Sequence, residues 1–375
     1  MHILYILDFY KPNNGGIEIL FDNIISRISK NHKVSIITFR YSDKLPKFEQ
    51  INEKINIYRV GKWNLLNFAL AAYKKWKEII EDVDIIHTSN FYAVFPAKLL
   101  SHKYKKKALV HINGFFGKYR NNFIWWKGYK FRLLEWLTCK LKFDKYICVS
   151  RYIKWIMKTL YGVKENRLEV IYNAVDYDLW NVDNFVEENI DFIIEKYNLD
   201  HFYSVLFYGR PDRIKGIDYF IQAIPDILKR IPNFKAFLIV PDNENENKDY
   251  KFLQKRIQEL GVEKNIIQIW AVEHELLWNY ILAVDCVIMP SLWEAFGYAA
   301  AETSALGQNL IVSSIAALPE VSSGKVNFIE PANPDNIVDA VWNFYNGKYT
   351  EIPFRGFYWE NTIKQIEELY INNEL

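Results

Sequence analysis

Short apolar runs alternate with helical patterns along the whole chain. In the first half, the runs that predict strands are residues 3–7, 34–39, 55–60, 85–87, 108–112, 146–149 and 168–172. In the second half they are residues 205–208, 236–240, 266–269, 286–289, 310–312 and 326–329. Between these runs, apolar residues recur at the helical spacing. Strands that alternate with helices predict an α/β protein with parallel sheets covered by helices on both faces.

The length and the charge pattern indicate two domains. A chain of 375 residues is about 2.5 times as long as a typical domain. Residues 176–200 are acidic and contain no predicted strand, so they are interpreted as a linker between residues 1–175 and residues 201–354. Residues 1–175 hold 31 Lys and Arg against 14 Asp and Glu, whereas residues 176–375 hold 16 against 31. Domains of opposite charge are expected to face different partners.

The composition argues against several classes of protein. Half of the residues are apolar and a quarter are charged, which is typical of a globular protein. No run of about 18 apolar residues occurs, so no transmembrane helix is expected. The first residues lack the basic segment and cleavage site of a signal peptide, and they are interpreted as a strand. The three widely spaced cysteines argue against a disulfide scaffold or a cysteine-based metal site, and they fit a reducing cytoplasm.

Three segments that follow predicted strands carry candidate chemistry, because ligands in α/β folds bind at the carboxyl ends of strands. The first is Gly15-Gly16-Ile17-Glu18, which opens the first predicted helix. Two glycines allow a backbone to approach a ligand closely, and a helix N-terminus favours an anion. A tight turn without a ligand explains the same residues equally well. The segment is not GxGxxG, so a dinucleotide-binding fingerprint is not supported.

The second segment is the loop from Gly209 to Gly216, which contains Arg210 and Lys215. Cations beside glycines at the end of a strand suit a diphosphate, because Arg grips two oxygens and Lys adds a point charge. A solvated basic loop is the alternative. The loop lies in the acidic half of the chain, and this favours cations that serve a ligand.

The third segment runs from Pro290 through Glu294, Phe296 and Gly297 to Glu302. If the residues between the two glutamates are helical, the rise is about 12 Å. That is longer than the roughly 5 to 9.5 Å between the carboxyl groups of a glycosidase pair. It suits two hydroxyl-bearing parts of one extended ligand, with a phosphate at the helix N-terminus near Gly297. A surface glutamate and an unrelated structural one are the alternative.

In this order and spacing, the segments resemble the retaining GT-B glycosyltransferases of glycosyltransferase family 4. The GGxE turn, the G-R-x(n)-K-G loop and the E-x7-E element match residues 15–18, 209–216 and 294–302. The stretch VIYNAVD at 170–176 resembles the family's interdomain VIPNGVD. The resemblance implies two Rossmann-like, doubly wound parallel-sheet domains that face an interdomain cleft, and a last helix, residues 355–375, that crosses back to the first domain.

The resemblance also implies a retaining hexosyltransferase that moves a sugar from a nucleotide-diphosphate donor, UDP or GDP type, to an acceptor hydroxyl. It implies no metal and no further cofactor. The roles carried over by position are a diphosphate clamp, a ribose contact by Glu302, a sugar contact by Glu294 and an active-site histidine. The residues given these donor-binding or catalytic roles are Gly15, Gly16, His111, Arg210, Lys215, Trp270, Glu294, Phe296, Gly297 and Glu302.

The sequence departs from the family pattern in places, so the donor base and sugar are left open. The Gly-rich turn after the second strand of the second domain is replaced by residues 241–244, Ala271 stands where glycine is common, and Ala316-Ala317 replace Gly-Gly. Asp82-Val83-Asp84 spells the DxD metal motif of another transferase fold, but it precedes a strand and lacks that fold's surroundings. A sugar-binding or nucleotide-binding protein without transfer activity is the alternative function, and no specific nucleic-acid binding is expected.

Residues 103–132 combine nine Lys and Arg with aromatic residues and contain no acid. Such a surface suits anionic headgroups, with aromatic rings at the interface. The sequence therefore predicts a carbohydrate or lipid-linked acceptor and a peripheral contact with an anionic membrane. The alternative is a solvated basic face in which Trp126, Leu133 and Leu137 form an ordinary buried helix stripe. In that case, the alternative function is a transferase whose acceptor is a soluble protein or an oligosaccharide.

Overall fold

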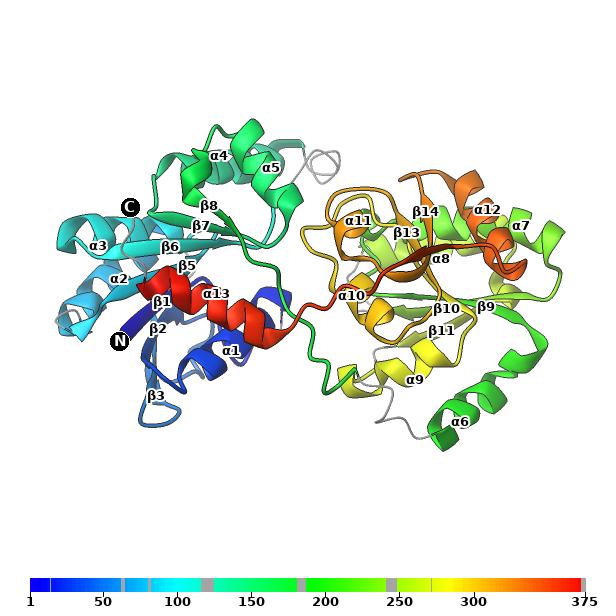
Figure 1. Ribbon diagram of the computed structural model, residues 1–375, viewed down its shortest axis with the longest axis horizontal. Helices are drawn as coiled ribbons and strands as arrows, with labels where there is room; N and C mark the ends of the chain where they lie inside the picture. The colour runs from blue at the N-terminus through cyan, green and yellow to red at the C-terminus, as the bar shows by residue number, and fades with distance from the viewer. Residues whose placement is uncertain are drawn as a thin grey trace. The chain divides into compact units, whose positions relative to one another are not determined.

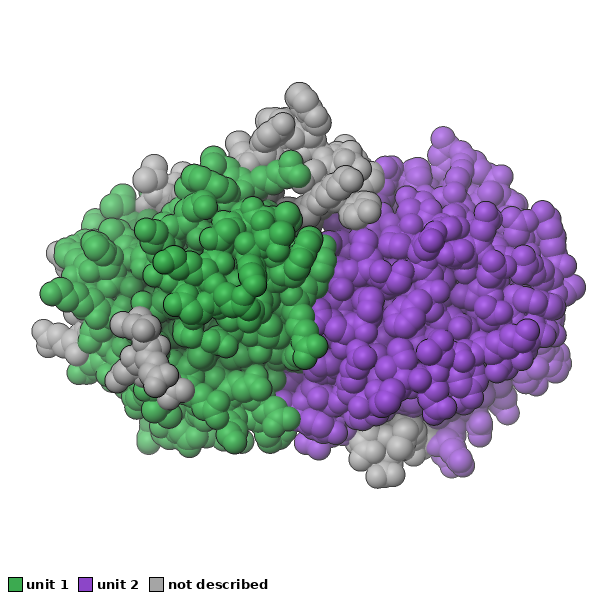
Figure 2. Space-filling view, turned by 45° about the horizontal axis from the view of Figure 1, so that its top comes forward, with its two compact units in different colours: residues 1–173, 359–375 green, residues 174–358 purple. Residues whose placement is uncertain are grey.

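The computed structural model describes residues 1–13, 15–61, 65–79, 82–115, 125–180, 187–240, 248–270 and 272–371, without the side chains of 65–66, 77–78, 125–131 and 248. The chain forms two compact units, which Figure 2 shows in different colours. Residues 1–173 and 359–375 make the first unit, and residues 174–358 make the second. Among the described residues, no helix combines the length and the apolarity needed to cross a membrane.

The first unit contains an eight-stranded sheet in the order β3-β4-β2-β1-β5-β6-β7-β8. Its strands are β1 (His2–Leu7), β2 (Lys33–Phe39), β3 (Phe48–Gln50), β4 (Ile55–Val60), β5 (Ile85–Ser89), β6 (Lys107–Ile112), β7 (Lys145–Cys148) and β8 (Leu168–Val170). Neighbouring strands are parallel except for β3, which pairs antiparallel with β4 at the edge. The predicted strands are confirmed within a few residues. Strand β3 is not among them, because its sequence Phe-Glu-Gln is short, polar and partly exposed.

The helices of the first unit are α1 (Gly16–Ile28), α2 (Leu65–Ile79), α3 (Val94–Tyr104), α4 (Trp125–Lys140), α5 (Arg151–Thr159) and α13 (Trp359–Ile371). The buried side chains of α1 include Leu20, Phe21 and Ile24, which repeat at the predicted helical spacing. Helix α13 lies beside α1 (Figure 1), where the Arg27 guanidinium is 4.6 Å from the centre of the Trp359 ring. The last helix therefore completes the first unit.

The second unit contains a seven-stranded sheet in the order β11-β10-β9-β12-β13-β14-β15. Its strands are β9 (Tyr203–Tyr208), β10 (Phe234–Val240), β11 (Ile266–Trp270), β12 (Cys286–Met289), β13 (Leu310–Ser313), β14 (Gly324–Ile329) and β15 (Thr350–Ile352). All neighbours are parallel except β14 and β15. The order reverses between β9 and β12, the kind of switch point at which doubly wound sheets bind ligands beyond their carboxyl ends.

The helices of the second unit are α6 (Glu187–Tyr197), α7 (Ile217–Arg230), α8 (Lys248–Leu260), α9 (Leu277–Leu282), α10 (Tyr298–Ala305), α11 (Leu318–Val321) and α12 (Pro334–Tyr345). Helices α7 and α12 pack together, and Phe220, Ile224 and Val341 are fully buried in their shared core. The interpretation of residues 176–200 as a linker is wrong, because the second unit begins at Ala174 and this segment contributes α6 to it. Ile193 of α6 is buried, so the helix packs as part of the unit.

Candidate functional site

The basic loop of the second unit directly follows β9, as predicted. Asp212 accepts a hydrogen bond from the backbone N–H of Lys215 at 3.2 Å and begins the 3-10 turn Arg213–Lys215. Arg210 is 67% exposed, and its Nη2 lies 3.3 Å from Oδ2 of Asp212. The loop therefore fixes the backbone that carries Lys215 and leaves the Arg210 guanidinium in water.

An ion pair joins the basic loop to the segment before α10. Lys215 Nζ lies 2.6 Å from Oε1 of Glu294, although 79 residues separate them along the chain. Ser291, which is buried, donates from Oγ to the same carboxylate oxygen at 3.2 Å. The basic loop and the segment before α10, both of which we expect to bind a diphosphate sugar, thus meet in one cluster.

Gly216 allows the two segments to come together. Its φ is +70°, in the left-handed region that glycine adopts without strain. A Cβ atom built on it would lie 1.8 Å from the carbonyl oxygen of Pro290, which no side chain tolerates. The backbone N–H of Leu292 donates to the carbonyl of Ile214 at 2.7 Å and ties the contact. Glycine at this position is therefore a packing requirement.

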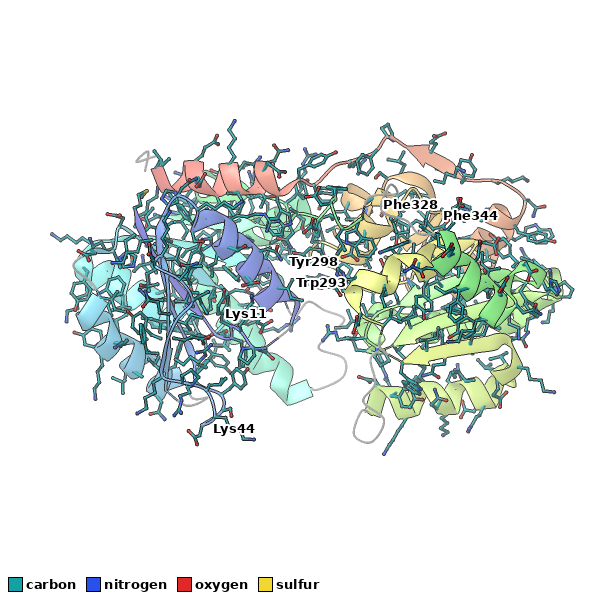
Figure 3. The ribbon with its side chains drawn as sticks, turned by 90° about the horizontal axis from the view of Figure 1, so that it is seen from below. Lys11, Lys44, Trp293, Tyr298, Phe328 and Phe344 are labelled. Carbon is teal, nitrogen blue, oxygen red and sulfur yellow. The ribbon has the colours of Figure 1, made fainter. Side chains whose placement is uncertain are left out.

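Helix α10 begins at Tyr298, so its N-terminus lies at Gly297 as predicted. The residues from Glu294 to Gly297 are not helical, and the rise of about 12 Å, which holds only for a helix from Glu294 to Glu302, does not apply. Gly297 breaks the regular backbone with a φ of +98°, and a Cβ there would lie 2.8 Å from Cδ2 of Leu318. Phe296 is only 2% exposed, and its ring packs against Tyr298 and Phe357. Its side chain belongs to the core, which leaves only its backbone for a ligand. Figure 3 labels Trp293 and Tyr298 in this segment.

Glu302 lies one turn into α10 and is largely buried. Its Oε1 is 3.3 Å from Nε2 of His274, a residue that sequence reasoning missed because no motif surrounds it. The hydrogen bond and the charge of Glu302 raise the pKa of His274 above its usual value. The Trp180 ring meets His274 edge to face at 5.2 Å. Glu302 therefore forms a polar contact with His274, and both side chains can take part in ligand binding.

Trp270 ends β11, where it is half-buried beside Tyr250 of α8 at a ring distance of 5.1 Å. This contact places the ring on the α8 side of its sheet. Ala271 and residues 241–244, at which the sequence departs from the family pattern, lie outside the described residues.

In the first unit, Gly15 and Gly16 open α1 as predicted. Gly15 is the residue before the helix, and a Cβ atom on it would lie 2.2 Å from Oε2 of Glu18. The Glu18 carboxylate thus folds back onto Gly15, where its Oε1 accepts a hydrogen bond from Asn13 at 2.8 Å. The GGxE segment is therefore a compact polar turn in which glycine leaves room for the glutamate.

His111 lies near the end of β6 and is fully buried. Its ring stacks in parallel on His87 at 5.7 Å and meets Phe21 edge to face at 5.6 Å. Burial lowers the pKa of His111 to about 3, although nearby Asn173 opposes this change. The imidazole is therefore neutral at physiological pH. It offers one donor and one acceptor nitrogen, and it is not a cationic acid.

A second layer of polar aromatic residues supports His111. His87 Nδ1 lies 2.7 Å from the Tyr370 hydroxyl, which in turn lies 2.8 Å from the Tyr5 hydroxyl. Tyr370 belongs to α13, whereas Tyr5 belongs to β1. The packing of the last helix thus fixes the ring on which His111 stacks. Sequence reasoning missed this layer because it joins residues from both extremes of the chain.

Further polar side chains meet at the carboxyl edge of the same sheet. Ile6 pairs with Thr88, and Ser89 pairs with His111, so the segments after β1, β5 and β6 share this edge. They carry Asp8, Asn90 and Asn113. Oδ1 of Asp8 and both polar side-chain atoms of Asn113 are buried without a hydrogen-bond partner among the described residues. Buried polar atoms normally have partners, which marks this edge as a site for a polar ligand.

Burial raises the pKa of the Asp8 carboxyl to about 7, although backbone N–H groups of residues 92 and 93 oppose the change. A raised carboxyl pKa means that the folded state holds a proton that the unfolded state releases above pH 4, so stability falls as the pH rises toward 7. Asp8→Asn is expected to stabilise the protein by about 1–2 kcal/mol at pH 8, where the carboxyl is ionised, and clearly less at pH 5. The expected gain is modest because Asp8 keeps part of its surface in water. Urea unfolding at both pH values checks this expectation. The exposed Asp82→Asn is the control, and an equal gain for Asp8→Asn at both values would contradict it.

Comparison with known proteins identifies related sequences and folds. Residues 14–179 match the family model described as Glycosyltransferase Family 4, and residues 189–352 match that of Glycosyl transferases group 1. An uncharacterised glycosyltransferase of Methanocaldococcus jannaschii is 27% identical over 95% of this chain and 94% of its own length. A phosphatidylinositol N-acetylglucosaminyltransferase subunit of Arabidopsis thaliana is 23% identical over 91% of this chain and 73% of its own. The structure of Anabaena HepE in complex with UDP has a TM-score of 0.72 at 15% identity, covers 99% of this chain and 96% of its own, and has the same fold.

Proposed function

Because the chain belongs to the family 4 glycosyltransferases, with a group 1 glycosyl transferase domain and the GT-B fold, we propose that it transfers a hexose from a nucleotide-diphosphate sugar to an acceptor hydroxyl with retention of configuration. The observation that carries the donor assignment is the cluster of Lys215, Glu294 and Ser291 at the carboxyl end of β9. Doubly wound sheets bind phosphorylated ligands at this kind of strand end.

The cluster suggests how the reaction proceeds. Departure of the nucleoside diphosphate builds negative charge, which Lys215 and the exposed Arg210 stabilise most strongly in the transition state. Glu294 is engaged by Lys215 and Ser291, so we assign it to the hydroxyls of the transferred sugar and not to nucleophilic attack. We assign His111 to hydrogen bonds with the reacting sugar. Its imidazole is neutral because of its low pKa, so we do not assign it the role of a cationic acid.

A transfer screen over UDP and GDP sugars tests the proposal directly. We expect one donor class to give a glycoside whose anomeric configuration, read by proton NMR, equals that of the donor. An inverted product would contradict retention. Tight binding of a nucleotide sugar without hydrolysis or transfer, over a broad set of acceptors, would favour the alternative of a binding protein.

Glu302→Ala is expected to weaken donor binding by about 10-fold to 100-fold and to change turnover at saturating donor much less. A hydrogen bond to a charged group is worth about 1.5–3 kcal/mol, and a ribose contact is the same in the ground state and the transition state. Titration calorimetry with the donor nucleotide measures the affinity. Glu275→Ala, an exposed neighbour of His274, is the control and should bind normally. A fall in turnover at unchanged affinity would count against the ribose contact.

For the acceptor of this reaction, we favour an anionic, lipid-linked molecule. One relative is a phosphatidylinositol N-acetylglucosaminyltransferase subunit, whose name gives a phospholipid acceptor. In helix α4, Leu133 is 56% exposed and Trp136 is 47% exposed, and Lys140 Nζ lies 5.9 Å from the Trp136 ring. The alternative of an ordinary buried stripe is therefore wrong for Leu133. The predicted aromatic and basic residues at 116–124 lie outside the described residues.

The protein is expected to sediment with vesicles that contain anionic phospholipid and not with neutral vesicles, and to dissociate at high salt. Each cation near the surface contributes about 1 kcal/mol, and Trp136 and Leu133 insert at the interface. A Leu133→Ser/Trp136→Ser variant should lose most of this binding. Leu276→Ser, an exposed leucine of the second unit, is the matched control. Absence of binding at low salt would leave a soluble protein or oligosaccharide as the acceptor.

A further inference from the structure

A basic pocket lies in the first unit at the end of α3, away from the edge that carries His111. Its volume is about 390 Å³, and it is lined by Lys98, Ser101, His102, Lys105, Lys106, Lys107 and Asp144. Lys107 begins β6 and His111 lies four residues further along the strand, so the pocket and the histidine are about 13 Å apart along it. The pocket is therefore separate from the carboxyl edge of the sheet.

The chain holds two of the lysines in partly buried positions. Lys98 Nζ donates to the carbonyl of Lys142 at 2.9 Å, and Lys107 Nζ donates to the carbonyl of Leu369 at 2.6 Å. Burial lowers the pKa of both side chains, and the charge of Asp144 opposes this change. The Lys98 ammonium group thus gives up part of its hydration and donates to a carbonyl, which carries no net charge to balance it.

The charges in the pocket are unbalanced. Four lysines line it with one carboxylate, Asp144, whose Oδ2 already accepts the backbone N–H of Ala108 at 2.8 Å. Among the residues that the structure describes, no ion pair joins Lys98, Lys105 or Lys106 to a carboxylate. Lys105 also has a φ of +54°, a conformation in which glycine is usual after a helix, and a cation occupies it here.

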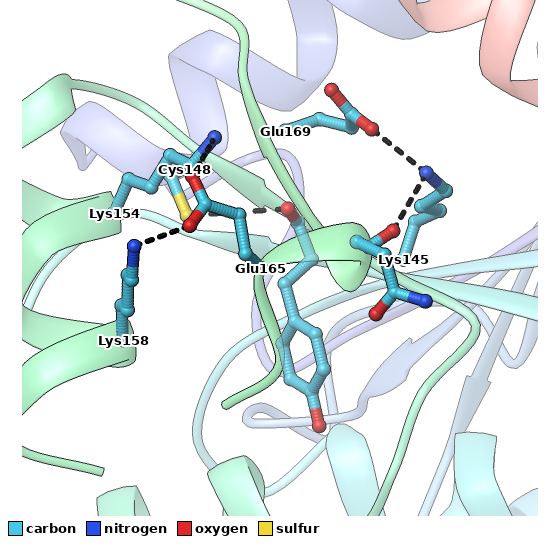
Figure 4. A network of polar contacts seen from close by, with 8 residues as sticks. Lys145, Cys148, Lys154, Lys158, Glu165 and Glu169 are labelled. Carbon is cyan, nitrogen blue, oxygen red and sulfur yellow. Dashed lines mark hydrogen bonds and ion pairs between the residues drawn. The ribbon is translucent and has the colours of Figure 1, made fainter. Parts of the chain in front are cut away.

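Nearby lysines in the same unit are balanced. Figure 4 shows Lys145 joined to Glu169, at 2.7 Å, and Lys158 joined to Glu165. A neighbouring cavity, which shares Lys107, contains Lys145 together with Glu169 and Glu368. Lys145 and Lys158 thus differ from Lys98, Lys105 and Lys106, for which no such carboxylate partner is seen among the described residues.

We propose that this pocket binds a phosphomonoester or diphosphate group, as a second anion site outside the donor cluster. A group of charge near −2 with several acceptor oxygens matches a pocket that several lysines line. The volume is in the range of small-ligand pockets. The group belongs either to a soluble phosphorylated molecule or to a phospholipid headgroup, and both present the same chemistry to the lysines.

Lysine labelling of the full-length protein with an amine-reactive ester, read by mass spectrometry, tests the site residue by residue. Pyrophosphate is expected to reduce the labelling of Lys98, Lys105 and Lys106 at least about 5-fold, because bound phosphate shields the amines. Lys44 and Lys47, which are exposed in the same unit, should not change; Figure 3 shows Lys44 pointing away from the ribbon. Because Lys215 is read separately, failure of the pocket and failure of the donor cluster give different results.

Two further experiments identify the source of the phosphate group and the residues that bind it. Protection by glycerol 3-phosphate supports a soluble ligand, whereas protection by phosphatidic acid vesicles and not by glycerol 3-phosphate supports a headgroup. A Lys105→Glu/Lys106→Glu variant should lose the protection of Lys98, and a Lys44→Glu/Lys47→Glu variant of the same charge should keep it. Unchanged labelling with every phosphate probe, or equal protection by sulfate at matched ionic strength, would overturn the proposal.

Discussion

Replacing Lys215 with alanine is expected to lower turnover by about 10² to 10³ while the protein stays folded. Lys215 lies 2.6 Å from Glu294 at the end of the loop that follows β9, where we place the leaving diphosphate. A contact that strengthens as charge develops is worth about 3–4 kcal/mol in the transition state. Turnover at saturating donor measures the loss, and thermal unfolding monitors the fold. Arg210→Ala is expected to have an effect of the same order.

The controls separate the clamp from general effects of charge. Arg213→Ala removes a cation from the same loop, but its guanidinium packs 4.4 Å from the centre of the Phe252 ring, so turnover should stay within about 3-fold. Removal of Lys215 also leaves Glu294 without its cation. A Lys215→Ala/Glu294→Gln variant therefore reports how much of the loss comes from that carboxylate. Near-normal turnover in both the Lys215 and Arg210 variants would refute the phosphate clamp.

Gly216→Ala is expected to abolish most activity and to destabilise the second unit. A Cβ atom at this position would lie 1.8 Å from the Pro290 carbonyl oxygen, and the φ of +70° disfavours alanine in any case. Either the loop or the segment before α10 must move, and Lys215 then separates from Glu294. We expect turnover to fall at least about 10²-fold, because a displacement near 1 Å is enough for such a loss. Transfer assays and thermal unfolding measure the two effects.

Gly261→Ala isolates the backbone part of this effect. Gly261 has nearly the same conformation, with a φ of +64°, but no atom lies within 4 Å of the position that a Cβ atom would take there. The change should cost about 1–2 kcal/mol of stability and leave turnover unchanged. If Gly216→Ala behaves like Gly261→Ala in both measurements, the close contact with Pro290 does not hold the cluster together.

The sequence allowed most of the sheet to be predicted, because the central strands are apolar runs buried on both faces. The edges were harder. Strands β3 and β15 have three residues each, are largely exposed and pair antiparallel, so neither composition nor alternation marks them. Helix α6 was missed for a related reason, since Ile193 is its one buried residue and its other apolar side chains, such as the exposed Phe192, stand among acidic residues.

The candidate site was predicted in part. Arg210, Lys215, Glu294 and Glu302 stand out because cations, glycines and carboxylates recur at fixed positions after strands. The contact of Lys215 with Glu294, and that of His274 with Glu302, depend on loops that meet only in the folded unit. The polar side chains of Asp8 and Asn113 stand in no recognisable spacing. Only the folded structure shows that Oδ1 of Asp8 and both polar side-chain atoms of Asn113 lack partners among the described residues.

The return of α13 to the first unit has a consequence for synthesis on the ribosome. Residues 174–358 are contiguous, so the second unit can fold as soon as they emerge. The first unit leaves the ribosome earlier, but Tyr370, which holds His87 beneath His111, is translated after the whole second unit. Nascent chains are generally expected to fold from the N-terminal domain onward. Here all residues of the second unit are synthesised before the first unit is complete. Until α13 is translated, the first unit lacks the buried residues Trp359, Ile366 and Tyr370 that this helix contributes.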